Sequence, residues 1–256
     1  MGEKRTILSV KDLGINFGGL QAVKGVSFDV LEKQIVGLIG PNGAGKTTVF
    51  NLLTSVYTPT EGTITLDGKL LHGEKTYKVV KYGIGRTFQN IRLFKGLSVI
   101  DNVKIALNNE MSYGTLTGLL RLPKYWKEEK AATDKAHELL KVFDLDGLAD
   151  ITASNLPYGQ QRKLEIVRAL ATGPKLLLLD EPAAGMNHTE TKGLMETISF
   201  VRDKFGVSIL LIEHDMNLVM GICEKIVVLD YGMVIASGTP KEIRENEKVI
   251  GAYLGR

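Results

Sequence analysis

The sequence lacks most of the features that mark secreted, membrane-spanning or nucleic-acid-binding chains. It has one cysteine, Cys223, in 256 residues, which excludes an internal disulfide framework and fits a reducing compartment. No apolar run approaches the ~20 residues that a membrane-spanning helix needs, and the first residues lack the apolar core of a signal peptide. The net charge of +3 is too small to argue for nucleic acid, and no basic run carries interleaved aromatic residues.

Apolar material, in contrast, is ample. Apolar residues make up 44% of the chain and charged residues 24%, which is close to the average for soluble domains. The length suits one large domain or two small lobes that share a core. We therefore expect a globular chain with a substantial buried interior.

The spacing of apolar residues predicts an α/β chain. Residues 33–40, 175–182 and 207–215 are short apolar runs typical of buried strands. A helix-like segment between the last two predicts a βαβ unit with parallel strands. Asp230-Tyr231-Gly232 divides a later apolar stretch into a hairpin, and a helix is expected after Pro240.

Residues 90–170 contain no convincing strand and predict a helical lobe inserted within one domain that spans residues 1–256. Ala132, Ala136, Leu139, Leu140 and Phe143 mark one face of an amphipathic helix there. The segment NNEMSYGTLTGLLRLP inside this lobe fits no element.

A glycine-rich loop between the first of these strands and a helix is the main functional signal. Its sequence, GPNGAGKTT, meets the pattern G-x-x-x-x-G-K-[ST], in which glycines let the backbone wrap around phosphates and the amides point inward. Lys46 can reach the β- and γ-phosphates, and the Thr47 hydroxyl can bind Mg²⁺. The nucleotide-binding candidates in this loop are Gly40, Pro41, Asn42, Gly43, Ala44, Gly45, Lys46, Thr47 and Thr48.

Two adjacent carboxylates, Asp180 and Glu181, end the second predicted strand. Ligands of open parallel sheets bind at the carboxyl ends of the strands, so both should lie beside the glycine loop. We expect Asp180 to hold Mg²⁺, partly through water, and Glu181 to polarise the attacking water. Taken alone, the pair would also fit an acidic turn before Pro182.

His214 ends the third strand and could contact the γ-phosphate, although a lone histidine also fits a structural role.

In their order along the chain these features resemble the ATP-binding subunit of an ABC transporter. The matching features are the loop at 40–48, Gln89, the helical lobe, Gly159-Gln160, and Asp180-Glu181 followed by His214. The resemblance covers nearly the whole chain and implies an ABC-type P-loop NTPase core with an N-terminal antiparallel β part. It also implies that two cassettes meet head to tail, with each ATP between the glycine loop of one chain and the signature motif of the other.

The resemblance identifies Tyr158, Gly159 and Gln160 as the signature motif. The usual family sequence is Leu-Ser-Gly-Gly-Gln, whereas this chain has Leu-Pro-Tyr-Gly-Gln from Leu156. Pro157 lacks both the serine hydroxyl and an amide hydrogen. The motif is therefore expected to act through backbone amides and the dipole of the helix N-terminus; a plain helix entry with no partner phosphate is the alternative.

The same resemblance assigns roles to four further residues. Phe17 would stack on adenine with Val23 nearby, although the sequence alone would place Phe17 in the core or at a strand end. Gln89 would act in catalysis and bind Mg²⁺, although a loop glutamine is usually just solvated. Asn187 stands where many members carry an aspartate that couples the two sites, which leaves its coupling role open.

Longer segments narrow the resemblance to the LivG-type subunit of branched-chain amino acid importers. They include GIGRTFQNIRLFKGLSVIDNV, LPYGQQRKLEIVRAL, LDEPAAGMN, TGLLRLP and the ending VIGAYLG. This implies an ATPase that closes as a dimer around MgATP at the cytoplasmic face of the inner (plasma) membrane. Its implied partners are membrane-spanning permease subunits and a second ABC ATPase, paralogous or identical. A substrate-binding protein would be involved only indirectly, and nucleic acid not at all.

Other functions stay open on the residues alone. Related subunits that serve urea transport or lipopolysaccharide export share much of this sequence. ABC ATPases that act on nucleic acid or ribosomes typically have long coiled-coil arms or two tandem cassettes, whereas this chain has one cassette and no heptad run. A P-loop kinase would need an acceptor site and gives no reason for the Gly-Gln motif or the second carboxylate.

Overall fold

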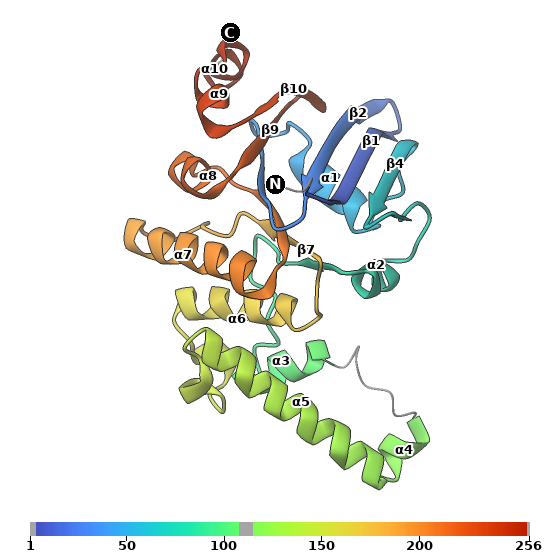
Figure 1. The fold of residues 1–256 in the computed structure, drawn as a ribbon, viewed down its shortest axis with the longest axis vertical. Coiled ribbons are helices and arrows are strands. Elements are labelled where there is room, and N and C mark those ends of the chain that lie inside the picture. The colour runs from blue at the N-terminus through green and yellow to red at the C-terminus, as the bar shows by residue number, and fades with distance from the viewer. Residues whose placement is uncertain (1–3, 108–114, 255–256) are drawn as a thin grey trace. The chain divides into compact units, whose positions relative to one another are not determined.

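The computed structural model describes residues 4–107 and 115–254. The chain divides into two compact units: a core unit, formed by the parts before Asn90 and after Gly173, and a helical unit, Asn90–Gly173. Figure 1 shows sheets with helices around them in the former and helices in the latter. The helical unit covers nearly the same residues as the lobe expected at 90–170.

A six-stranded sheet forms the centre of the core unit, in the order β10-β9-β3-β8-β7-β6. The first five strands in chain order pair in parallel, and β10 is antiparallel to β9. Its strands are β3 (Ile35–Ile39), β6 (Ile84–Arg86), β7 (Leu176–Asp180), β8 (Ser208–Ile212), β9 (Lys225–Asp230) and β10 (Met233–Gly238). The predicted parallel strands and the hairpin are therefore confirmed.

The order of the middle strands decides where the candidate residues meet. β8 lies between β3 and β7 and pairs in parallel with both. Every residue of these three strands is buried, as their continuous apolar runs require. The carboxyl ends of the three strands consequently lie at one edge of the sheet.

A second, antiparallel sheet lies at the N-terminal side of the core unit, as expected. Its order is β2-β1-β4-β5, and its strands are β1 (Thr6–Phe17), β2 (Leu20–Leu31), β4 (Glu61–Leu66) and β5 (Lys69–Leu70). Apolar side chains from β1, β2 and β4 pack with those of β3, β7 and β8 in one hydrophobic cluster. The two sheets therefore share a core.

Helices cover the sheets of the core unit (Figure 1). They are α1 (Lys46–Leu53), α2 (Thr76–Tyr82), α7 (His188–Phe205), α8 (Met216–Ile222), α9 (Pro240–Arg244) and α10 (Glu247–Leu254). Val49, Phe50, Leu52 and Leu53 of α1 lie in the cluster shared by the two sheets. This packing fixes α1 directly after the glycine loop.

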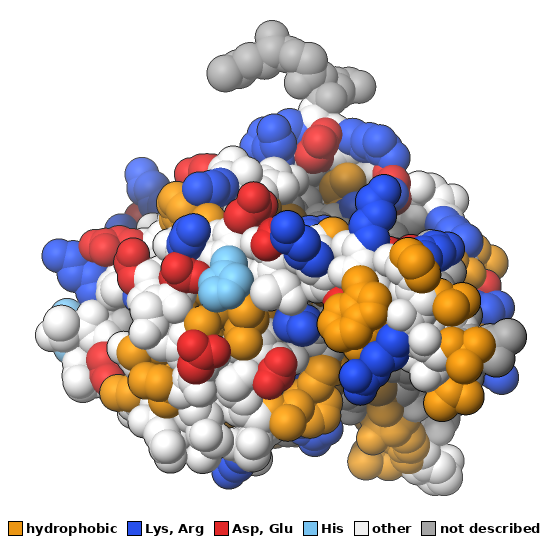
Figure 2. All heavy atoms as spheres, turned by 90° about the horizontal axis from the view of Figure 1, so that it is seen from below, with side chains coloured by type: hydrophobic (Ala, Val, Ile, Leu, Met, Phe, Trp, Pro, Cys, Tyr) orange, Lys and Arg blue, Asp and Glu red, His pale blue; other side chains and the backbone are white. Residues whose placement is uncertain are grey.

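The helical unit contains α3 (Val99–Leu107), α4 (Thr115–Leu119), α5 (Pro123–Val142) and α6 (Tyr158–Leu170). The predicted apolar face of α5 is buried. Part of the unassigned segment, residues 108–114, lies outside the described residues, and the rest forms α4 and the start of α5. None of the described helices is both long and apolar enough to span a membrane. Figure 2 shows one face of the molecule, with charged side chains of both signs interspersed.

A buried ion pair lies within α6. The Nη1 atom of Arg162 donates to the Oε2 atom of Glu165 at 2.7 Å, and the two side chains are 0% and 2% exposed. Glu165 also accepts a hydrogen bond from the backbone N–H of Arg92 at 3.2 Å. This second contact ties the segment at Arg92 to α6.

Replacing Arg162 by Ala should lower the free energy of unfolding by about 3–5 kcal/mol, because Glu165 would stay buried without the guanidinium group that lies 2.7 Å from it. The double variant Arg162→Met/Glu165→Leu should lose much less, since both charges leave together. Urea unfolding followed by circular dichroism measures both variants. Equal losses would show that packing, and not the ion pair, dominates at this position.

Candidate functional site

The glycine-rich loop runs from the end of β3 to the start of α1. Gly40 and Gly45 have φ angles of 151° and 100°, which side chains with a Cβ rarely adopt. A Cβ on Gly40 would also collide with the carbonyl oxygen of Leu229 in β9. The chain therefore needs glycine where the loop leaves the sheet and where the helix begins.

Lys46 is buried at the first position of α1, with 6% of its surface exposed. Its Nζ atom donates to the carbonyl oxygens of Gly40 at 2.7 Å and Pro41 at 2.9 Å. Burial lowers the pKa of Lys46, and the Glu181 carboxylate opposes that shift. The ammonium group is thus held inside the loop, where an anion would compete with the two carbonyls.

A cavity of about 350 Å³ opens on this loop. The loop residues from Asn42 to Thr48 line it together with residues of four other segments. These segments contribute Leu20, Gln21, Ala22 and Lys24 of β2, Glu181, His214 and Tyr231. The structure therefore brings the glycine loop, Glu181 and His214 to one cavity, as their positions in the sequence predict.

Glu181 lies at the centre of a hydrogen-bond network. Its Oε1 atom is 2.7 Å from Nε2 of His214, and its Oε2 atom accepts from Nε2 of Gln89 at 2.5 Å. The backbone of Glu181 has a φ of 46°, an uncommon conformation for a residue other than glycine. Three residues predicted separately are therefore joined around one carboxylate.

Asp180 has a partner that the sequence analysis missed. Its Oδ2 atom accepts from Nη2 of Arg86 at 2.9 Å, and the two side chains are 7% and 9% exposed. Arg86 also donates to Asn51 at 2.8 Å and to Thr54 at 3.2 Å, both in or next to α1. In the sequence Arg86 is only a basic residue at the end of a short strand, in GIGRTF. That signal is too weak to interpret without knowing that β6 pairs with β7.

The oxygen atoms near the cavity fit a magnesium ion. Thr47 is exposed in the cavity. Asp180 precedes the cavity residue Glu181, and Gln89 contacts that residue, so both are near the cavity without lining it. They add carboxylate and amide oxygens, which are the hard ligands that Mg²⁺ uses. No cluster of three His, Cys, Asp or Glu side chains among the described residues could hold a metal alone. A magnesium ion here would therefore take its other ligands from phosphates and water.

Glu213 is a second functional residue that the sequence analysis passed over. It is 3% exposed and accepts backbone N–H groups of Ala183 at 2.7 Å and of His214 at 2.8 Å. It thereby links the segments that carry Glu181 and His214. The sequence did contain a signal, because LLIEHD has a charged residue within an apolar run. A carboxylate buried there needs hydrogen-bond donors such as these backbone N–H groups.

The two residues predicted to lie at adenine, Phe17 and Val23, differ in how much of their surface is exposed. Phe17 is 43% exposed and packs edge-on against Tyr57, with 5.1 Å between the ring centres. Phe17 does not line the cavity described above. Val23 is fully buried in the core, and its neighbour Ala22 lines the cavity. Val23 therefore offers no side-chain surface to a base, because neighbouring strand residues point to opposite faces.

Comparison with known proteins agrees with this geometry. The sequence model of the ABC transporter family matches residues 23–184. The chain belongs to the ABC transporter family. This finding and the fold confirm the predicted ABC-type P-loop core, and with it the assignment as an ATPase of this class.

Relatives of this cassette cover almost its full length. It is 48% identical to the high-affinity branched-chain amino acid transport ATP-binding protein BraF of Pseudomonas aeruginosa, over 98% of each chain. It is 48% identical to LivG of Escherichia coli, over 97% of this chain and 98% of LivG. The lipopolysaccharide export ATP-binding protein LptB of Escherichia coli is 34% identical over 97% of each chain. A solved ATP-binding cassette of an ABC transporter in its ADP conformation has a TM-score of 0.85 and 30% identity, covering 98% of this chain and 99% of that chain.

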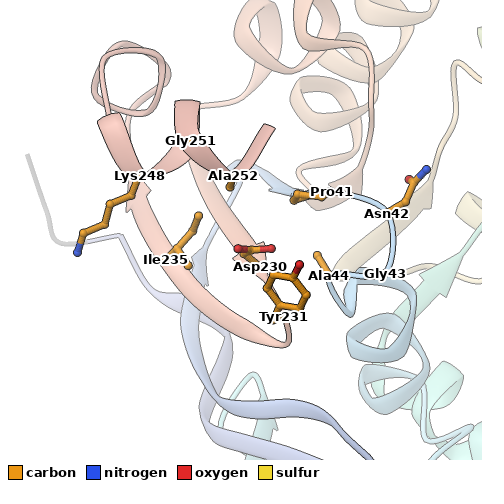
Figure 3. Close-up of a pocket in the computed structure, with 10 residues that line it drawn as sticks. All are labelled: Pro41, Asn42, Gly43, Ala44, Asp230, Tyr231, Ile235, Lys248, Gly251 and Ala252. Carbon is orange, nitrogen blue, oxygen red and sulfur yellow. The ribbon is translucent and has the colours of Figure 1, made fainter. Parts of the chain in front are cut away.

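The C-terminal end of the cassette faces the glycine loop across a cavity. Residues 233–256 match a model described as a branched-chain amino acid ATP-binding cassette transporter. A cavity of about 650 Å³ separates this segment from the loop, with Lys248, Gly251 and Ala252 on one side and Pro41 on the other (Figure 3). Burial raises the pKa of the Tyr253 hydroxyl, and a hydrogen bond with the Gly40 backbone opposes that shift.

The signature residues begin a helix of the helical unit. Pro157 is the N-cap of α6, and Tyr158, Gly159 and Gln160 form its first turn. The Pro157 carbonyl accepts the N–H groups of Gln160 and Gln161, each at 3.0 Å. The first N–H groups of a helix lack intrahelical acceptors, so this turn can present amides to an anion.

Asn187 has a local role that its sequence position did not reveal. It is the N-cap of α7, where its side chain accepts the N–H of Glu190 at 3.0 Å. The Glu190 carboxylate in turn accepts the N–H of Asn187 at 2.9 Å. Asparagine and aspartate both make this capping box, so the departure from the family pattern keeps the helix start intact.

Replacing Gly40 by Ala should destabilise the cassette by about 1–3 kcal/mol, because the added methyl group would collide with the β9 backbone. It should also weaken nucleotide binding, since the loop would have to move. Thermal unfolding with and without ATP measures both effects. Gly193→Ala in α7, where a Cβ meets nothing within 4 Å, is the matched control and should not destabilise. A Gly40→Ala variant with the same stability and ATP affinity as this control would contradict the assignment.

Proposed function

We propose that this cassette binds MgATP at the glycine loop, dimerises around two nucleotides and hydrolyses them to energise an importer of branched-chain amino acids. The observation that carries the proposal is the Glu181 carboxylate, held by Gln89 and His214 at the cavity that the glycine loop also lines. The relatives named for branched-chain amino acid transport and the C-terminal match support the substrate class. LptB is less similar, which favours amino-acid import over lipopolysaccharide export.

The phosphates would bind to the loop amides and to Lys46. Lys46 would exchange the carbonyl oxygens of Gly40 and Pro41 for phosphate oxygens, and the N-terminus of α1 would add its partial positive charge. Thr47, Asp180 and the amide oxygen of Gln89 would hold Mg²⁺, partly through water. The ion, when bound, neutralises charge on the phosphates.

Glu181 would orient and polarise the attacking water. Each carboxylate oxygen has more than one acceptor site, so contacts with Gln89 and His214 leave capacity for a water proton. His214 would fix the direction of the carboxylate, and its ring lies where it could also reach the γ-phosphate. The arrangement therefore keeps a general base at a set position before substrate arrives.

Two cassettes would complete each nucleotide site. The first turn of α6 would face the ATP bound to the other chain, with Gly159 allowing close approach of the backbone. The proposed partners are permease subunits in the membrane and a second ABC ATPase, paralogous or identical. The cassette would then lie at the cytoplasmic membrane face, with exposed apolar side chains of the helical unit such as Phe94 and Leu97 available for docking.

Copurification with membrane-spanning subunits, followed by ATP-dependent uptake of labelled leucine into vesicles that contain the complex, tests the transport assignment. Uptake of a different solute would change the substrate class. Stimulation of hydrolysis by DNA or ribosomes would favour a non-transport ABC ATPase. Phosphoryl transfer to a small molecule would favour a kinase.

Replacing Glu181 by Gln should keep ATP binding and lower turnover by roughly 10²–10⁴-fold, the usual contribution of a general base. Phosphate release and nucleotide titration measure the two quantities separately. The matched control is Glu196→Gln, an exposed position on α7. Turnover at the wild-type rate in the Glu181 variant would remove this residue from the proposed role.

Replacing Gly159 by Asp should block ATP-driven dimerisation, because a carboxylate at the start of α6 would repel the phosphates of the other chain. ATP binding by the single chain should be unchanged. Size-exclusion chromatography with ATP, in the slowly hydrolysing Glu181→Gln background, reports the dimer. Gly147→Asp places the same charge at an exposed site of the helical unit and serves as the control. Dimers that survive only in the control support the assignment, and dimers in both variants contradict it.

A further inference from the structure

Large apolar side chains are exposed together where α4 meets α5 in the helical unit. Leu119, Leu120, Leu122 and Trp126 are 78%, 59%, 43% and 57% exposed. The buried residues of α5 begin at Ala132, so the first part of this helix contributes no fully buried side chain to a core. We name residues 119–130 the α4–α5 corner.

Basic side chains accompany these apolar residues. Arg121, Lys127 and Lys130 are exposed, and none of them forms an ion pair within the part of the chain that the structure describes. The guanidinium carbon of Arg121 lies 6.0 Å from the centre of the Trp126 ring, within reach of a cation–π contact. Figure 2 shows hydrophobic and basic side chains side by side on the right of the view, the side where α4 lies in Figure 1.

The acidic residues of the corner do not cancel this charge. Glu129 pairs with Lys104 at 3.2 Å, and Glu128 lies 3.7 Å from Lys124. Each carboxylate therefore already has a cation, and the remaining charge of the corner is positive. An anionic surface would be attracted to this part of the helical unit.

The combination fits a lipid bilayer better than a groove on a protein. Leucines and a tryptophan at a turn between two helices form a projecting apolar point, and tryptophan favours the boundary between headgroups and acyl chains. Lysine and arginine side chains can lay their apolar stems along the same boundary while their charges reach anionic headgroups. Charge complementarity selects an anionic bilayer as the occupant.

We propose that the α4–α5 corner inserts into the headgroup region of an anionic membrane and holds the cassette against it. The proposal rests on the peripheral membrane location proposed above, but it needs neither ATP hydrolysis nor a permease. A lipid contact of this kind would restrict the cassette to the membrane surface, which raises the rate at which it meets membrane-embedded partners.

Tryptophan fluorescence tests the proposal directly, because the chain has a single tryptophan and it lies at the corner. Vesicles made of equal parts phosphatidylglycerol and phosphatidylcholine should shift the Trp126 emission to shorter wavelength, and brominated lipids should quench it. Vesicles of phosphatidylcholine alone should give a much weaker response. Added salt should reverse the binding, since the anionic attraction is screened.

Variants separate the two parts of the contact. Replacing Arg121, Lys127 and Lys130 by Gln should weaken binding to anionic vesicles about five-fold for each charge removed. Leu119→Ser/Leu120→Ser/Leu122→Ser should reduce quenching by brominated lipids. Leu70→Ser/Tyr77→Ser, which removes exposed apolar side chains of the core unit, is the control and should bind like the wild type. Circular dichroism and ATP turnover verify that each variant is folded.

Three outcomes would overturn the proposal. Trp126 emission that does not respond to anionic vesicles would show that the corner does not enter the bilayer. Vesicle binding without quenching would assign the lipid contact to another face. A response that appears only when permease subunits are present would assign the corner to a protein partner. A cassette that binds vesicles through Trp126 yet does not hydrolyse ATP would instead contradict the proposed function alone.

Discussion

The hydrogen bonds between β3, β8 and β7 are the constraint on which the candidate site depends. Because these strands are parallel neighbours, their carboxyl ends lie at one edge of the sheet. Lys46 follows the loop after β3, Glu181 follows β7 and His214 follows β8, so residues separated by up to 168 positions, 214 − 46, line one cavity. No side chain at this edge needs to be long or mobile to reach the cavity.

Charge is balanced at this edge by separate partners. Two adjacent carboxylates would repel each other if both faced the cavity without donors. Instead, Asp180 pairs with Arg86, while Glu181 contacts Gln89 and His214. A magnesium ion at Asp180 would have to share this carboxylate with Arg86. Metal binding at Asp180 would therefore be coupled to the arginine contact, and the pattern of two acidic residues after a strand could not reveal that contact.

The parts of the fold that the sequence predicts well are those with local signals. The three buried strands have continuous apolar runs, and the glycine loop has a fixed spacing between a strand and a helix. Arg86 was not predicted as a site residue because β6 has only three residues, Ile84–Arg86. Arg86 reaches the site only because β6 pairs with β7, which is distant in sequence. The sequence also could not show that Ala22 lines the cavity while Val23 is buried, because the face to which a strand residue points depends on register. The signature motif is predicted to act on a second chain, so that contact stays a prediction.

The glycine loop is held by backbone contacts from two other segments. At the tip of the β9–β10 hairpin, the N–H of Gly232 donates to the Ala44 carbonyl at 3.1 Å, and its carbonyl accepts the N–H of Lys24 at 2.7 Å. Tyr253 of α10 contacts the Gly40 backbone. Gly232 lies directly before the segment that matches the branched-chain amino acid transporter family, residues 233–256, and Tyr253 lies within it. A loop already held in place would lose less freedom on binding phosphate, so these contacts would favour the proposed nucleotide site. The C-terminal segment would then contribute to the energetics of that site, although none of its residues lines the cavity at the loop.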